Sequence, residues 1–542
     1  LKLVLGISGS GKTTLLYARI RARAEAGKRS ILLVPEQFTS STEARIYREL
    51  GDALSGMVES YSFTSLAEHI LAIEGGAAVQ TLSDAGRAVL VRRALEELQD
   101  NVHYYHRHRR SAAFCQMAAE TIDELKSAGL SGQQLQELAR DCGTESAKLG
   151  ELALIFQGYE SLLAGTGMDP ADRLELAADR LEAALARDEL PDFLREREVF
   201  IDEFDTFNAP KKRLMGAMLA ALPAVTVALC EDGAPMQPGD LELFSGAKQV
   251  AAQLRQLARK NGAQVAAPEL LRRDLRHKDA PGLAALTELL ETGSCTPPES
   301  APELRLFAAA SREEEARCAA AAIRRLMRQG VRCGKIAVVC RDISLYRAAV
   351  RYEFRMAEIP LYCDEPTTPE FSAPATAVRA LLALLRGADM TEQLTVLAKT
   401  GLCDLTEPEV CALENYAYTW SPNAAAWRAE FTKSPRGFGD AELTEEDTLN
   451  MTRAENARKK LVTAVDTLRS KVRSANAEQI SRALYFCLKE LGAEEQQAAQ
   501  VEDIRTARGI PAAEEAAREW NVVMQLLDEM ARLLGSQGIT VP

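Results

Sequence analysis

Short apolar runs alternate with helical periodicity over residues 3–70 of the chain. Apolar runs at 3–5, at 31–34 and within 56–71 have the length of buried strands, and a helical pattern follows each of them. This order is typical of βαβ units, in which helices connect parallel strands. The beginning of the sequence therefore predicts a parallel sheet.

The pattern is almost entirely helical over residues 80–190, which are rich in Ala, Leu, Glu and Arg. Strand patterns return at 197–207 and at 224–233, and residues 250–300 are expected to be helix and loop. The helical stretch therefore predicts an insertion between strands of one α/β unit.

A second α/β unit is predicted after the linker CTPPES. Strands are expected at 303–311, 335–342 and 357–365, with a helix over 312–330 that ends at Gly330. From about residue 370 strand signals vanish and helices dominate. One of these helices, within 457–472, has apolar residues at helical spacing that indicate core packing: Leu461, Val465, Leu468 and Val472.

The segment GISGSGKT fits the phosphate-loop pattern G-x-x-x-x-G-K-[ST] between an expected strand and an expected helix. Its glycines allow backbone N–H groups to point at phosphate oxygens, Lys12 can reach the β- and γ-phosphates, and Thr13 can ligate Mg²⁺. The alternative is a purely structural glycine-rich turn that binds no nucleotide. The predicted nucleotide-binding residues are Gly6, Ser8, Gly9, Ser10, Gly11, Lys12, Thr13 and Thr14.

The apolar run Val199 to Ile201 ends in two acids, Asp202 and Glu203. A P-loop ATPase needs such a pair, because the first acid holds the Mg²⁺ shell and the second orients or deprotonates the attacking water. Acids after apolar runs are common, but the phosphate loop earlier in the sequence supports a functional interpretation of this pair. We predict Asp202 and Thr13 as the metal-site residues.

Composition narrows the class of protein. The hydrophobic fraction is 47%, the charged fraction is 26% and the formal net charge is −13, so phosphate binding needs locally concentrated positive charge. No apolar run has the length of a membrane span, and no signal peptide is recognisable. The 11 cysteines form no C-x-x-C pair, which favours a reducing compartment and buried thiols.

The segment NVHYYHRHRR (101–110) interleaves histidine and tyrosine with arginine. Aromatic rings can stack on bases and arginines can neutralise phosphates, so Arg107 and Arg109 are candidate DNA contacts. The alternative is a solvated helix or loop face. RGFGD (436–440) lacks a lysine and a preceding strand, and we interpret it as a loop.

Two α/β units with helical blocks resemble the layout of superfamily 1 DNA helicases. LLVPEQFT resembles motif Ia, SYSFTSLAEHIL the next motif, and FIDEF motif II. The forms PEQFT, SFTSLA, IPLYCDE and LAKTGLCDLTEPEVCALENYAYTW are similar to AddB, the RexB-like B subunit of the AddAB ATP-dependent helicase–nuclease. This resemblance covers essentially the whole chain in order.

The resemblance implies an α/β fold of P-loop NTPase (RecA-like) domains with helical insertions. It makes residues 1–75 and 195–300 the first RecA-like, ATP-binding domain and 76–194 its insertion. It makes 301–368 the start of a second RecA-like domain and 369–542 a second helical insertion. The chain begins without methionine and shows no nuclease motif, so we expect a fragment that ends before a nuclease domain.

The resemblance also implies functional residues. Pro35 and Gln37 of motif Ia and Phe63 and Ser65 of the next motif are candidate DNA contacts; Phe63 as a core residue and Gln37 as a helix cap are the alternatives. Arg341, after a predicted strand, would point at the γ-phosphate. Family members often carry Asp-Gly in motif II, whereas Asp202-Glu203 keeps the second acid.

The function implied is that of a cytoplasmic, ATP- and Mg²⁺-binding subunit that acts with an AddA-like partner on single strands and duplex ends. The complex would process double-strand breaks for homologous recombination, and this subunit would take part in reading the Chi sequence. A 4Fe-4S cluster would belong to the full-length protein outside this chain. The alternatives are an autonomous superfamily 1 helicase and, from another class, a P-loop kinase.

Overall fold

The computed structural model describes residues 1–76, 80–235, 243–363, 369–439 and 442–535. One six-stranded sheet forms the centre of the first α/β region, with the strand order β3-β2-β4-β5-β1-β6 and all pairs parallel. The prediction of an α/β fold with a parallel sheet is therefore confirmed. The strands are β1 (Lys2–Gly6), β2 (Ser30–Leu33), β3 (Val58–Tyr61), β4 (Glu198–Ile201), β5 (Ala224–Cys230) and β6 (Glu269–Leu271).

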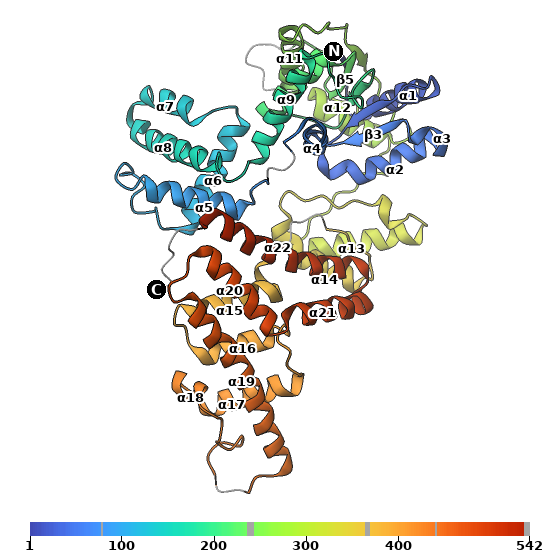
Figure 1. Ribbon diagram of the computed structural model, residues 1–542. Coiled ribbons are helices and arrows are strands. Elements are labelled where there is room, and N and C mark those ends of the chain that lie inside the picture. Colours follow the sequence, from blue (N-terminus) through green and yellow to red (C-terminus); the bar gives the residue numbers. More distant parts are fainter. Residues whose placement is uncertain (77–79, 236–242, 364–368, 440–441, 536–542) are drawn as a thin grey trace.

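Helices cover both faces of this sheet (Figure 1). Successive strand residues point to opposite faces, so Leu32 and Phe200 pack in one apolar cluster whereas Leu33 and Ile201 pack in the other. Burial on both faces explains why the strands are continuous apolar runs. The helical elements interleaved with the strands are α1 (Lys12–Glu25), η1 (Glu36–Phe38), α2 (Thr39–Leu50), α3 (Asp52–Ser55), α4 (Phe63–Glu74), α10 (Ala209–Ala221), α11 (Ser245–Lys260) and α12 (Pro281–Thr292).

A block of helices lies between β3 and β4 in sequence, as the pattern over 80–190 predicts. Its last helix packs against α4 and α10 and so belongs to the cover of the sheet, while the others build a separate apolar cluster. The helical elements are α5 (Asp84–Glu97), α6 (Ala112–Ser127), α7 (Gly132–Arg140), η2 (Gly143–Glu145), α8 (Ser146–Leu163) and α9 (Pro170–Ala186).

The second predicted α/β region contains its helices but lacks its strands. α13 (Arg312–Arg328) and α14 (Ile343–Met356) pack on each other through a small core that includes Ile323 and Phe354. No described residue between 272 and 363 is in a strand, so the strands expected at 303–311, 335–342 and 357–365 are not confirmed. η3 (Cys333–Lys335) overlaps one of them, and Asp364 and Glu365 lie outside the described residues.

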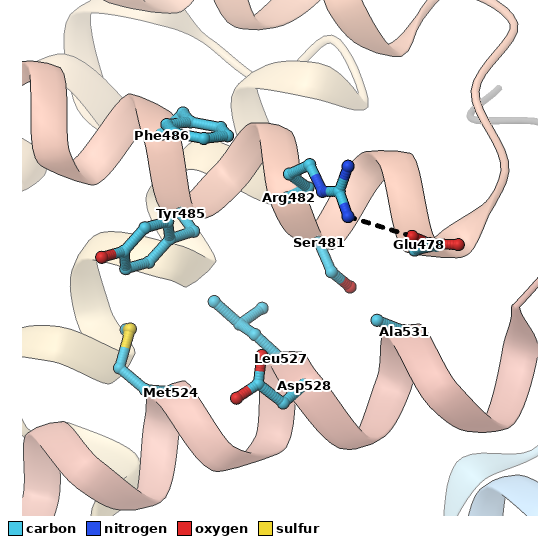
Figure 2. Close-up of a pocket in the computed structure, with 9 residues that line it drawn as sticks. All are labelled: Glu478, Ser481, Arg482, Tyr485, Phe486, Met524, Leu527, Asp528 and Ala531. Carbon is cyan, nitrogen blue, oxygen red and sulfur yellow. Dashed lines mark hydrogen bonds and ion pairs between the residues drawn. The ribbon is translucent and has the colours of Figure 1, made fainter.

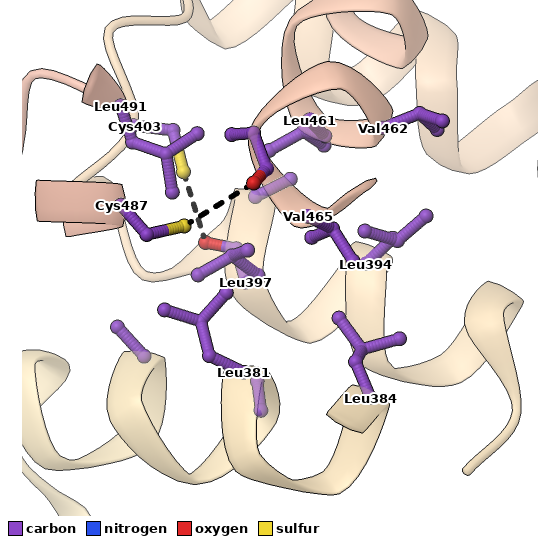
Figure 3. Packing of buried hydrophobic residues seen from close by; sticks show 14 of the residues in the cluster. Leu381, Leu384, Leu394, Leu397, Cys403, Leu461, Val462, Val465, Cys487 and Leu491 are labelled. Carbon is purple, nitrogen blue, oxygen red and sulfur yellow. Dashed lines mark hydrogen bonds between the residues drawn. The ribbon is translucent and has the colours of Figure 1, made fainter. Parts of the chain in front are cut away.

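The described part of the remaining chain is helical, as expected, and has an extensive apolar core of its own. Leu461 and Val465 are fully buried there (Figure 3), and so is Leu468, which confirms the core interpretation of that helix. Residues 436–439 form the expected loop; Asp440 lies outside the described residues. The elements are η4 (Pro369–Phe371), α15 (Ala373–Leu385), α16 (Met390–Lys399), α17 (Glu407–Trp420), α18 (Ala424–Arg428), α19 (Glu445–Val472), α20 (Ala477–Glu490), α21 (Ala493–Arg508) and α22 (Ile510–Leu534).

Two thiols lie inside this core. Cys403 and Cys487 are buried, their Sγ atoms each lie 3.7 Å from a backbone carbonyl, and burial raises the pKa of both thiols to about 12 (Figure 3). The expectation of buried thiols holds for these two and for Cys115, whereas Cys142 and Cys411 are exposed.

The last helix joins the two helical blocks. α22 packs against α5, where Glu529 accepts a hydrogen bond from the Ser83 backbone N–H at 3.0 Å and Arg93 donates to the Leu533 carbonyl at 2.9 Å. Figure 1 shows α22 passing from the lower helical block to α5. Within the described ranges, no helix is both long and apolar enough to cross a bilayer.

Candidate functional site

The phosphate-loop sequence forms a turn between the carboxyl end of β1 and the start of α1. Gly9 and Gly11 adopt left-handed backbone conformations with φ of 74° and 89°, which glycine tolerates best. A Cβ atom on Gly6 would lie 2.6 Å from the Leu271 carbonyl oxygen, so this glycine is required by the close approach of β6. Local geometry therefore explains each glycine of the motif.

Lys12 and Ser10 bring polar groups into the loop. The Lys12 ammonium donates to the carbonyl oxygens of Gly6 and Ile7, at 2.8 Å each. Ser10 is buried and its hydroxyl has no hydrogen-bond partner, which is costly unless a ligand or water supplies one. An ammonium, an unpartnered hydroxyl and the start of α1 are the donors that a nucleotide phosphate requires. The residues present therefore fit MgATP.

Asp202 lies directly beside this loop. The Leu33 carbonyl accepts a hydrogen bond from the Asp202 N–H at 3.1 Å, which extends the pairing of β4 with β2 by one residue. Thr13 lies near enough to the Asp202 carboxylate to lower its pKa, so the two predicted metal-site residues are neighbours. Burial raises the pKa of Asp202, although Thr13 and the nearby Lys12 and Arg45 charges oppose this.

Glu203 follows in a left-handed conformation with φ of 65°, which is unusual for a residue with a side chain. Its side chain is exposed, and its backbone N–H donates to the Asp202 carboxylate at 3.0 Å. Partial desolvation and the Asp202 charge raise the pKa of Glu203, while Arg45 lowers it. A carboxylate with a raised pKa is a stronger base, which suits proton removal from water.

Arg45 of α2 is a site residue that the sequence analysis missed. Its guanidinium lies 4.9 Å from the centre of the Tyr17 ring, and its charge acts on both motif II acids. Burial raises the pKa of Tyr17 to about 12, so this phenol stays neutral beside the acids. No motif marks Arg45, because it is brought to the site by the packing of α2 rather than by spacing in sequence.

A second missed feature is the segment Arg272–Asp279, which connects β6 to α12 and covers the loop. The Leu275 N–H donates to the Gly9 carbonyl at 3.0 Å. Burial and the charges of Asp274 and Asp232 raise the pKa of Glu291, on α12, while Lys12 and Ser8 of the loop lower it. The sequence pattern predicts only helix and loop here and gives no signal for β6, whose three residues are partly exposed.

The residues predicted to contact DNA fall into different environments. Gln37 is exposed in η1, and Pro35 immediately precedes η1. Phe63 is buried, with its ring 5.3 Å from that of Phe204, so the structure favours the core interpretation over a DNA contact. Ser65 is half-buried and forms the capping box of α4 with Ser62.

The aromatic and basic segment 101–110 is a loop whose backbone is hydrogen-bonded to one carboxylate. Glu151 of α8 accepts hydrogen bonds from three successive backbone N–H groups, His103 to Tyr105, at 2.6 to 3.1 Å. Arg107 is exposed and Arg109 is half-buried. The loop therefore presents positive charge at the surface and is fixed in position by Glu151.

Arg341 lies far from the loop in sequence, just before α14, and its side chain is exposed. Among the described residues it forms neither a hydrogen bond nor an ion pair with the phosphate loop. Its contact with a γ-phosphate therefore stays a prediction.

Away from the phosphate loop, the described residues offer little further chemistry. Across the part of the chain that the structure describes, no group of three or more His, Cys, Asp or Glu side chains could hold a metal ion. A groove between α20 and α22 has Tyr485 and Phe486 at its rim, and Arg482 there forms an ion pair with Glu478 at 3.2 Å (Figure 2). No residue predicted from sequence lies in this groove.

Comparison with known proteins agrees with these observations. The family described as "ADDB, N-terminal" matches residues 3–287. The B subunits of the ATP-dependent helicase/deoxyribonuclease from Moorella thermoacetica and Desulforudis audaxviator are 30% and 29% identical over 99% and 100% of this chain, which covers 48% of each. The protein of the same name from Clostridium acetobutylicum is 24% identical over 100% of this chain. The match covers 47% of the length of the Clostridium acetobutylicum protein. The chain thus spans about half the length of these curated relatives.

Proposed function

This chain belongs to the AddB N-terminal family, and on that premise we propose that it is the ATP- and DNA-binding part of a helicase–nuclease subunit. The complex would process double-strand breaks for homologous recombination in the cytoplasm, with an AddA-like subunit as the partner. The relatives are named as subunits of a helicase/deoxyribonuclease, which supports a role within a complex.

The observation that carries the proposal is the position of Asp202 at the carboxyl end of β4, in the same parallel sheet as β1 and its phosphate loop. The loop and the acids are almost 190 residues apart in sequence, and the parallel pairing of the strands brings them together. This convergence at the carboxyl ends of the strands is where nucleotides bind in open α/β sheets. It supports a nucleotide site far better than either motif alone.

Each of these residues would have its own role in MgATP binding and hydrolysis. Lys12 would exchange its carbonyl contacts for phosphate oxygens, while the Thr13 hydroxyl and Asp202 would hold the hydrated Mg²⁺. Glu203 would take a proton from the attacking water. When bound, MgATP supplies the phosphoanhydride bond whose cleavage drives movement on DNA. We keep Arg341 as a proposed γ-phosphate contact.

DNA would bind to surfaces beyond this site. Gln37 and Arg107 are exposed, Arg109 is half-buried, and Glu151 accepts hydrogen bonds from the backbone of the arginines' loop at His103 to Tyr105. Because the net charge is −13, we expect binding that is weak and strongly salt-dependent. We propose further that a protein of the relatives' length takes part in reading the Chi sequence and holds a 4Fe-4S cluster outside the residues of this chain.

Nucleotide binding is tested by calorimetric titration of MgATP into the chain and its Lys12→Ala variant. Loss of a charge-assisted phosphate contact should cost about 1.5–3 kcal/mol, or roughly 10- to 150-fold in affinity. Lys28→Ala is the matched control, because Lys28 is exposed shortly after α1. Equal affinity of Lys12→Ala and the parent would overturn the assignment.

DNA binding is tested with a fluorescent oligonucleotide at several salt concentrations. Arg107→Ala should weaken binding and reduce the salt slope by about 1, whereas Arg140→Ala, at an exposed helix end, should change neither. Unchanged binding by Arg107→Ala would remove the loop from the interface.

An autonomous helicase is the second candidate, favoured by the retained second acid Glu203 at the surface of the site. Unwinding of a tailed duplex by this chain alone, lost in Glu203→Gln with MgATP affinity nearly unchanged, would support it. No unwinding until the longer protein and its partner are added would favour the role within a complex.

A further inference from the structure

A hollow at the turn between α19 and α20 has a charge opposite to that of the chain as a whole. Lys471, Arg473 and Arg482 line it, and no described residue of its lining is an acid. Serine hydroxyls and a glutamine amide add further hydrogen-bond donors to the lining. Because the formal net charge of the chain is −13, this group of cations is a local exception that attracts anions.

The cations of this basic hollow are available to a ligand. Lys471 pairs with Glu490 at 3.3 Å and Arg482 pairs with Glu478 at 3.2 Å, and the side chains of both pairs are exposed to solvent. Exposed ion pairs contribute little stability, so their cations can exchange partners. The exposed guanidinium of Arg473 forms no ion pair or hydrogen bond within the described ranges. An anion can therefore engage all three cations without breaking a strong contact.

An aromatic ring forms another part of the lining. Phe486 lies one helical turn after Arg482 on α20 and is 45% exposed. The Lys471 ammonium lies 6.0 Å from the centre of the Phe486 ring. Such exposure leaves much of the hydrophobic stabilisation of this ring unused. Aromatic faces in this setting stack on nucleobases of any identity.

The basic hollow is continuous with the groove between α20 and α22. Arg482 and Phe486 line both, because residues four apart lie on the same face of a helix. Tyr485 lines the groove, and its ring centre lies 5.8 Å from that of Phe486 (Figure 2). The rim shared by the two depressions therefore carries a cation and a ring side by side, with a second ring next to it.

This combination favours one class of ligand. A free phosphate or an acidic peptide would use the cations but would leave the Phe486 ring exposed. A duplex would also use only the cations, because its bases are stacked on one another. A single strand presents phosphates and unstacked bases together, so it can use both kinds of group.

We propose that the basic hollow is a binding site for single-stranded nucleic acid, with phosphates on Lys471, Arg473 and Arg482 and a base stacked on Phe486. No sequence motif marks these residues, and they are distinct from the DNA contacts proposed at Gln37 and in the 101–110 loop. The inference rests on the proposed DNA-binding function and adds to it a second contact region, on the helices that follow residue 369.

The phosphate contacts are tested by titrating a fluorescent oligothymidine into the parent and Arg473→Ala at several salt concentrations. Loss of one exposed phosphate contact should weaken binding about two- to fivefold at low salt. It should also reduce the slope of log affinity against log salt by about 0.7. Lys489→Ala is the matched control, because Lys489 is an exposed cation of the same helix that lines neither depression. Equal changes in Arg473→Ala and Lys489→Ala would overturn the site.

The stacking contact is tested with Phe486→Leu, which keeps an apolar side chain but removes the aromatic face. The parent should bind oligothymidine roughly fivefold or more tightly than an abasic strand of the same length and charge. Phe486→Leu should lose most of this preference while it unfolds at the temperature of the parent. An undiminished preference in Phe486→Leu would refute stacking on this ring.

Arg107→Ala separates this inference from the proposed DNA-binding function. If Arg107→Ala weakens binding but Arg473→Ala and Phe486→Leu do not, the function stands and the basic hollow is refuted. If the parent binds no strand even at low salt, the proposed function itself is wrong. Additive losses in the double variant of Arg107→Ala and Arg473→Ala would support two separate contact regions.

Competition identifies the class of ligand. Unlabelled oligothymidine should displace the labelled strand from the parent, whereas polyglutamate of equal charge should displace it far less, because it has no bases to stack. Equal displacement by polyglutamate would make the basic hollow a site for acidic protein segments and would overturn the assignment to single strands.

Discussion

The two α/β regions of this protein have the same hydrophobic pattern and different structures. Around the phosphate loop, each apolar run is a strand paired in the sheet, and Ile31, Phe200 and Val227 are fully buried. In residues 301–363, equally apolar runs are irregular, and Leu306, Val339 and Tyr362 are 99%, 91% and 88% exposed.

The difference is one of pairing, not of composition. A strand satisfies its backbone N–H and C=O groups only through a neighbouring strand, and the first region assembles its sheet from segments as far apart as β1 and β6. Helices need no such partner, because their hydrogen bonds are local. α13 and α14 therefore form in the second region although no described residue there is in a strand.

Hydrogen exchange should give the largest contrast between the two regions. Amides of β4 should exchange only through global unfolding, with opening free energies of about 5–15 kcal/mol. Amides of 337–340 should exchange with free energies near zero, because no ladder protects them. Slow exchange of 337–340 in this chain would mean that these residues pair in solution, and the contrast would disappear.

Leucine truncation tests the contrast in packing. Leu32→Ala, at 1% exposure in β2, should lower the free energy of unfolding by about 2–5 kcal/mol. Leu306→Ala, at 99% exposure, should change it by less than about 0.5 kcal/mol. The measurement is chemical denaturation followed by circular dichroism. A similar cost for both variants would show that Leu306 is buried in solution.

The sequence predicts the parts of the site that are contiguous. The loop from Gly6 to Thr13 is one segment, and Asp202 and Glu203 follow a strand whose pattern is local. Five of the six strands could be predicted in the same way. β6 was missed because its three residues lie at the sheet edge and carry little apolar signal.

The rest of the site depends on contacts between distant segments. Arg45 and Asp274 reach the loop through the packing of α2 and the turn after β6, and no spacing rule links them to Lys12. At Phe63, conversely, a sequence motif predicts a role that the contacts in the structure do not favour. Its motif resemblance suggests DNA, whereas its ring contacts with Phe204 and Phe207 place it in the core.

Strain at Glu203 can be compared with a residue of the second region. Glu203 and Glu358 are both left-handed, with φ of 65° and 54°. Such a conformation costs a residue with a side chain roughly 1–2 kcal/mol, and glycine loses roughly 0.5–1 kcal/mol of this in chain entropy. Glu203→Gly and Glu358→Gly should therefore each raise the free energy of unfolding by about 0.5–1 kcal/mol.

Turnover separates the two glycine variants. Under the proposed mechanism Glu203→Gly removes the base and abolishes ATP hydrolysis, whereas Glu358→Gly leaves it unchanged. Stability gained at Glu358 but not at Glu203 would indicate that the Glu203 side chain contributes contacts that offset its backbone strain. Thermal unfolding and a phosphate-release assay give the two readouts.

The smallest expected effect is the acid sensitivity of the first region. Burial acts to raise the pKa of Glu59 in β3, but the hydrogen bond from Tyr61, the ion pair with Arg197 and the charge of Arg29 outweigh it and lower that pKa. The Arg197 guanidinium lies 2.7 Å from the Glu59 carboxylate and is itself 8% exposed.

A carboxyl group with a lowered folded-state pKa contributes stability above its unfolded pKa, ordinarily about 4.3, and loses it as pH falls through the folded value. The first region should therefore lose stability below about pH 4, by less than about 1 kcal/mol from Glu59 because its side chain is 33% exposed. Denaturation measured from about pH 6 to about pH 3 should show a smaller loss of unfolding free energy in Glu59→Gln than in the parent.

Asp342→Asn is the matched control. Asp342, whose pKa is also lowered, caps α14 in the second region, so its replacement should not alter unfolding of the sheet. If the free energy of unfolding falls equally with pH in Glu59→Gln and the parent, residues other than Glu59 cause the acid sensitivity of the first region.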